Sequence, residues 1–135
     1  MLTTNTTLHT LDLSNNNINK SQSEQGPDGA TEIANMLTTN TTLHTLCLNF
    51  NNINAGGAIE IAKSLITNRA LHKLQMADIN IDMETITKIA KILESNYTLT
   101  NIFLIITNDN IKEIVRRNKY ISKNKRFMKT KNATF

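Results

Sequence analysis

Several residue types are scarce in this chain of 135 residues, and each shortage excludes a class of protein. One cysteine cannot form an internal disulfide, so this is not a small secreted domain held together by disulfide bonds. No run approaches the roughly 18 consecutive apolar residues of a membrane-spanning helix. Residues 1–5 show neither the basic start nor the apolar stretch of a secretory signal. We therefore expect a cytoplasmic protein, or a protein of the host cytoplasm if the source is an intracellular bacterium or a virus.

Charge is distributed unevenly along the chain, whose formal net charge is +4. Residues 112–131 hold nine basic side chains and one acid, whereas the remainder holds six basic and ten acidic side chains. The basic character of the protein is therefore a property of its C-terminal segment, and the body is mildly acidic.

The strongest signal is an internal repeat. The eleven residues MLTTNTTLHTL occupy positions 1–11 and again positions 36–46. The pattern L-x-x-L-x-L-x-x-N-x-I begins at Leu8 and at Leu43, and weaker copies begin at Leu71 and Leu99. The four starts are 35, 28 and 28 residues apart. Self-similarity at such a period is typical of stacked repeats, in which no unit buries its apolar side alone.

The second part of each unit has the periodicity of a helix. The pattern G-x-x-x-[LI]-A-x-x-L-x-x-N fits residues 29–40 and 57–68, and residues 85–96 fit it with Thr85 in place of the glycine. Apolar residues at i, i+1 and i+4 form one face of a helix, whereas alternating L-x-L is typical of a strand. We predict that each unit is a strand, a turn, a helix and a turn, with the strands parallel. An asparagine falls at each helix end, where we expect the left-handed conformation. These residues are Asn5, Asn40, Asn68, Asn96 and Asn118.

These signatures resemble the leucine-rich repeat family, in its ribonuclease-inhibitor-like class of 28-residue units with a full helix. The resemblance covers residues 1–118. It implies an α/β solenoid, a short curved horseshoe of about four units with parallel strands on the concave face and helices on the convex face. It also implies that Asn16 and Asn51 point inward and bond the backbone, a role that Ile79 and Thr107 do not match.

The two ends of the array depart from the repeat. A last helix with Ile111, Ile114, Val115 and Ile121 on one side is expected to close the C-terminal end, before a basic tail, 119–135, that is helical and then disordered. The chain begins mid-unit, which leaves the first strand as an open edge available for self-association. Residues 19–28 lengthen the first unit, either as a tolerated surface insertion or as a binding loop.

The resemblance implies binding rather than catalysis, because stacked repeats present an extended concave face and no catalytic constellation is found. We predict a non-catalytic protein–protein interaction module without a cofactor, whose protein partner is unidentified. Phe103 and Ile105 are candidate anchors, unless the closing helix or the tail covers them. By strand register the concave face consists of Thr10, Asp12, Ser14, Thr45, Cys47, Asn49, Lys73, Gln75, Ala77, Asn101, Phe103 and Ile105.

Two further features invite a chemical interpretation. His9, His44 and His72 recur at one position of successive units, which suggests either a metal site or a consensus residue copied by duplication. We favour the copied residue and expect no metal, because no carboxylate or thiol recurs beside the histidines. Cys47 has no signature of a nucleophile around it, so we interpret it as a small strand side chain.

The basic segment supports an alternative function. It would bind nucleic acid or an anionic surface through its cationic side chains, unless it is merely a solvated terminus. The candidate residues are Arg116, Arg117, Lys119, Lys123, Lys125 and Arg126.

Overall fold

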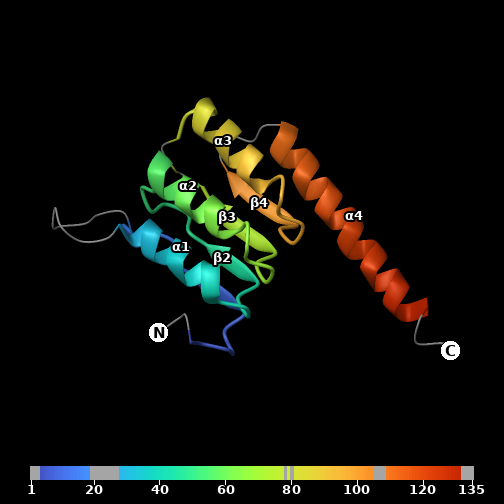
Figure 1. Cartoon of the computed structure of the whole chain (residues 1–135). Helices are drawn as coiled ribbons and strands as arrows, with labels where there is room; N and C mark the ends of the chain where they lie inside the picture. The colour runs from blue at the N-terminus through green and yellow to red at the C-terminus, as the bar shows by residue number, and fades with distance from the viewer. Residues whose placement is uncertain (1–3, 19–27, 78, 80, 105–108, 132–135) are drawn as a thin grey trace.

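The computed structural model describes the chain except for residues 1–3, 19–27, 78, 80, 105–108 and 132–135, and it describes side chains as far as residue 123 (Figure 1). Along the described chain, strands and helices alternate. The elements are β1 (Thr10–Asp12), α1 (Gly29–Thr39), β2 (Thr45–Cys47), α2 (Ala55–Ser64), β3 (Lys73–Met76), α3 (Met83–Leu93), β4 (Asn101–Leu104) and α4 (Asp109–Lys131). The strands form one parallel sheet in the order β1-β2-β3-β4, which confirms the predicted repeat array.

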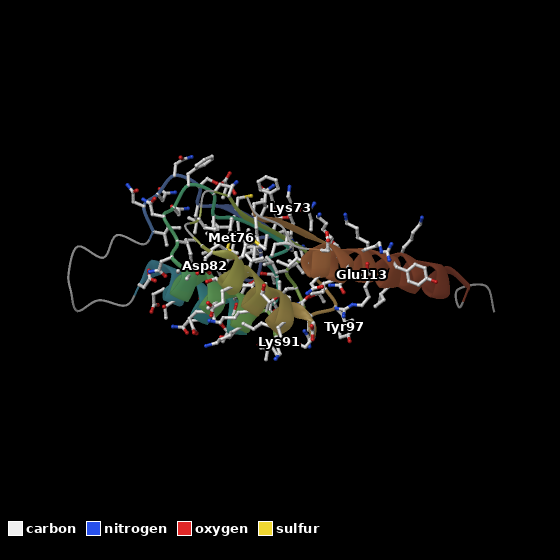
Figure 2. The ribbon with its side chains drawn as sticks, turned by 90° about the horizontal axis from the view of Figure 1, so that it is seen from above. Lys73, Met76, Asp82, Lys91, Tyr97 and Glu113 are labelled. Atoms are coloured by element: carbon white, nitrogen blue, oxygen red, sulfur yellow. The ribbon has the colours of Figure 1, made fainter. Side chains whose placement is uncertain are left out.

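The molecule has two layers. Helices α1, α2 and α3 lie side by side along the sheet, and α4 follows at the end of the row and continues past the body (Figure 1). Seen from above, Lys73 of β3 projects on the strand side, whereas Lys91 of α3 projects on the helix side (Figure 2). Each unit therefore contributes one strand to one layer and one helix to the other.

The apolar positions of the repeat form the core between the layers. In the second unit Leu43, Leu46, Leu48 and Ile53 are all buried, and α2 adds buried Ile61. The corresponding residues of the first unit are only partly buried, because no described unit covers their outer side. They are Leu8, Leu11, Leu13 and Ile18.

The asparagines at the helix ends do not adopt the left-handed conformation that we expected. Asn40 has φ −74° and ψ 127°, and the positive-φ residues in the described chain lie elsewhere, at Asn15, Asn17, Phe50 and Asn52. The side chain of Asn68 shows the actual role. Its Oδ1 accepts from the backbone N–H groups of the turn that follows, and its Nδ2 donates to carbonyls of the preceding unit. The side chains of Asn40, Asn68, Asn96 and Asn118 thus form hydrogen bonds between units, and their role does not depend on backbone freedom.

The asparagines of the strand signature bond the backbone in the first two units, as the resemblance implies, but only the one in the second unit is buried. Asn51 is fully buried, donates to the Leu13 carbonyl at 2.7 Å and accepts from the Asn16 N–H at 2.8 Å. Asn16 is exposed rather than inward, and its Nδ2 donates to the carbonyls of Leu13 and Ser14 within its own turn. Buried Ile79 takes the position in the third unit, and Thr107 lies outside the described residues.

Helix α4 closes the described array at its C-terminal end. Ile111 and Ile114 are buried against the core, whereas Val115 and Ile121 are half-buried. Asn118 is fully buried within the helix and donates to the carbonyls of Asn96 and Leu99. The hydrogen bonds between units thus extend from the repeats into the closing helix.

Candidate partner-binding surface

Two rows of side chains cross the sheet on the side away from the helices, and we call them together the open strand face. The strand register aligns the four residues of each row, because β1, β2, β3 and β4 pair residue by residue. Strand alternation points these residues away from the buried leucines between them. The first row is Thr10, Thr45, Lys73 and Asn101, and the second row is Asp12, Cys47, Gln75 and Phe103.

The composition of the open strand face changes across the sheet. Asp12 and Phe103 are exposed at its two ends, with 52% of Phe103 accessible, and Lys73 is half-buried between them. The side chain of Phe103 is exposed, and Ile105 lies outside the described residues. The face therefore offers an anionic end, a cationic centre and an aromatic end.

Hydrogen bonds fix several side chains of this face. The Asp12 carboxylate accepts from the Ser14 hydroxyl at 2.6 Å and from the Ser14 N–H at 2.9 Å, which lowers the pKa of Asp12. The Cys47 thiol donates to Gln75 Oε1 at 3.0 Å, and burial raises the pKa of the thiol. A protonated, hydrogen-bonded thiol is a poor nucleophile, so Cys47 is suited to contact rather than to chemistry.

The predicted residues beyond the strand ends are less available. Asn49 Oδ1 accepts from the Ala77 N–H at 2.8 Å, so this amide links the second and third units. Ala77 is buried and presents almost no surface. Ser14 is half-buried and committed to Asp12.

The three recurring histidines form a ladder where the strands begin. The rings of His9 and His44 stack with centroids 4.9 Å apart, and His72 meets His44 edge-on at 5.3 Å. Desolvation, and then the two neighbouring imidazoles, lower the pKa of His44. In the stacked pair His9 and His44, the nitrogen lone pairs lie side by side and do not point toward one shared metal position. Among the described residues, no group of three or more potential metal ligands occurs.

The basic residues of α4 differ in what they contact. Arg117 donates to the carbonyls of Glu94 and Asn96 and lies over the Tyr97 ring, 4.1 Å from its centroid, so it attaches α4 to the end of α3. Arg116 pairs with Glu113 on the surface. Lys119 and Lys123 are exposed, and the side chains of Lys125 and Arg126 lie outside the described part.

Sequence reasoning missed Phe50. This residue follows β2, is 52% exposed and has φ 57°, a left-handed conformation that is rare for an aromatic residue. The signal was present in the sequence, because Phe50 takes the position of Asn15 in the preceding unit.

The comparisons with known proteins agree with the repeat geometry. The family model described as "Leucine Rich repeat" matches residues 4–21 and 39–62, the segments that contain the first two strand signatures. These two segments are similar to leucine-rich repeats, and the described array of parallel strands and helices has the fold of such repeats. A search of curated proteins found no match.

Two solved structures share the fold of these leucine-rich repeats. One, titled "Leiomodin-1 Actin-Binding Site 2 (ABS2)", is similar with a TM-score of 0.74 and 27% identity over 78% of this chain. This chain spans 65% of that leiomodin-1 chain. The other, the tropomodulin C-terminal domain of Caenorhabditis elegans, has a TM-score of 0.50 and 12% identity and covers 91% of both chains, which shows the fold alone.

The repeat array and its similarity to the leiomodin-1 structure favour a protein-binding module. In the described part of the chain, no helix combines the length and the apolar composition needed to cross a membrane.

Proposed function

We propose that this protein is a non-catalytic interaction module that binds a protein partner through the open strand face. This face is the concave face in the solenoid implied by the repeat pattern. The observation that carries the proposal is the register of four strands, which brings eight side chains from four separate units into two rows. A surface assembled in this way contacts one partner through several units at once.

Actin is the partner that we propose. Support comes from the similarity to the leiomodin-1 actin-binding site, at 27% identity over most of this chain. The exposed aromatic ring of Phe103 and the charge of Lys73 are the features of the face best suited to a protein contact, since aromatic anchors contribute most to such interfaces.

The test is an isothermal titration of the purified chain into monomeric actin. We expect the wild-type chain to bind, and Phe103→Ala and Lys73→Ala to weaken binding about tenfold or more. Two control variants change the same kinds of side chain on the helix layer. Lys91→Ala removes an exposed lysine of α3, and Met83→Ala removes an apolar side chain that is 52% exposed, as Phe103 is.

The pattern of losses decides which surface is used. If Phe103→Ala and Lys73→Ala bind actin no more weakly than the two control variants, the proposal for the open strand face is contradicted. If the wild-type chain does not bind, actin is contradicted as the partner. The basic face of α4 is the second candidate, since Lys119 and Lys123 of this helix are exposed. Salt-sensitive binding that is lost in Lys119→Ala and Lys123→Ala, but retained in Phe103→Ala, would assign the contact to α4.

A further inference from the structure

Phe50 combines exposure with a backbone conformation that its side chain disfavours. Its φ of 57° lies in the left-handed region, where the β-carbon of most residues crowds the following carbonyl oxygen. The first unit makes the same turn with Asn15 at φ 61°, and asparagine tolerates this region. The turn therefore does not need an aromatic residue, and we expect the fold to be more stable with asparagine at position 50.

Hydrogen bonds from both neighbouring units hold this turn in place. The Phe50 N–H donates to the Ala77 carbonyl at 3.0 Å, and Asn49 Oδ1 accepts from the Ala77 N–H. On the other side, buried Asn51 bonds the Leu13 carbonyl of the first unit. Strained residues persist where the surrounding structure over-determines them, and they concentrate at binding sites. The ring of Phe50 is thus held on a rigid base while half of its surface remains exposed.

Phe50 lies in the turn that follows β2, three residues beyond Cys47 of the open strand face. Phe103 is in register with Cys47, three residues before Phe50 and two strands away. Two strand spacings of about 4.8 Å separate β2 from β4, so the two phenylalanines are on the order of 10 Å or more apart. A partner that covers both rings needs two apolar contact sites at that separation. The surface of a folded protein can present two such sites.

We propose that Phe50 is a pre-organised aromatic anchor that inserts into an apolar hollow of the partner, with Phe103 as the second anchor of the same interface. This inference rests on the proposed function and takes monomeric actin as the partner. Because the Phe50 side chain is already held in place, it loses little conformational freedom when a partner binds. This smaller loss of entropy on binding offsets the backbone strain at Phe50 in the free protein.

The test compares stability and affinity in the same variants. Phe50→Asn restores the residue used by the first unit, so we expect its midpoint of thermal unfolding to rise by about 3 °C. We expect its affinity for monomeric actin, measured by isothermal titration, to fall about tenfold. Phe50→Ala removes the ring without providing asparagine's tolerance of the turn, and it should lose affinity without gaining stability. Met83→Ala, equally exposed on α3, is the control for loss of an apolar side chain and should change neither quantity.

Opposite changes in the two quantities for Phe50→Asn support the inference. Unchanged affinity in Phe50→Asn, together with weakened binding in Phe103→Ala, overturns the role of Phe50 and leaves the proposed function intact. No binding by the wild-type chain overturns the partner and the anchor together. Weakened binding by Met83→Ala to the same extent shows a non-specific apolar effect and also overturns the inference.

Discussion

At the scale of single residues, asparagine is what joins one unit to the next. Asn68 is almost fully buried, and its side chain makes four hydrogen bonds, donating to the carbonyls of Leu37 and Asn40 and accepting from the N–H groups of Ala70 and Leu71. Its amide satisfies backbone groups of two units that water cannot reach. Asn96 repeats the arrangement one unit later.

We predict that Asn68→Ala lowers the free energy of unfolding by about 3 kcal/mol, because several buried backbone groups lose their partners. Urea unfolding followed by circular dichroism measures the change. Asn35→Ala, at an exposed position of α1, is the matched control and should change stability by less than about 0.5 kcal/mol. Similar losses in both variants would show that the buried amide has no special role.

At the scale of the helices, glycine sets how closely neighbours approach. A β-carbon at Gly57 would lie 2.6 Å from the Ala30 β-carbon of α1, closer than two carbon atoms can pack. One residue earlier, a β-carbon at Gly56 would meet only Asn54 Oδ1, at an ordinary 3.4 Å. Helices α1 and α2 therefore pack closely at Gly57, whereas Gly56 faces open space in the first turn of the same helix.

These two glycines should respond to alanine in opposite directions. Gly57→Ala forces α1 and α2 apart and should lower the free energy of unfolding by about 2 kcal/mol. Gly56→Ala should raise it by about 0.5 kcal/mol, because alanine loses less backbone entropy in a helix. The two urea unfolding curves give the comparison directly, and equal effects would contradict the close approach of the helices.

At the scale of the whole molecule, α4 protects the last unit of the array. Buried Ile111 and Ile114 cover the apolar side of that unit, and Arg117 binds two carbonyls at the end of α3, one of them at 2.6 Å. In a stacked array each unit is stabilised by its neighbours, so loss of this end piece weakens the units beneath it. We therefore predict that Arg117 contributes to stability, although its charge first suggested a binding role.

Arg117→Ala should lower the free energy of unfolding by about 2 kcal/mol, since it removes charge-assisted hydrogen bonds and the contact with Tyr97. Amide hydrogen exchange in α3 and β4 should become faster in this variant. Arg116→Ala removes only a surface pair with Glu113, so it should change stability by less than about 0.5 kcal/mol. If both variants exchange at the wild-type rate, α4 is not held by Arg117.

The local pattern of apolar residues predicted most of the fold. The alternation in Leu11 and Leu13 and the helical spacing in Ile61, Ala62 and Leu65 identify the elements, and the 28-residue period aligns Lys73 with Asn101. The role of the helix-end asparagines was misjudged, because it depends on carbonyls about 30 residues away along the chain. Asn51 bonds across to the first unit, whereas Asn16 is exposed and bonds carbonyls of its own turn.

The candidate binding surface divides in the same way. Strand register places the rows of the open strand face, so they follow from the repeat, whereas the attachment of Arg117 and the strained turn at Phe50 do not. The sequence alone determined the stacked α/β repeat. Its apolar residues recur at the same positions of each unit, and stacking the units side by side buries all of them together. The tertiary structure decided which asparagine is buried, which arginine is engaged and which phenylalanine stays exposed. Those outcomes depend on neighbouring units that meet only after the chain has folded.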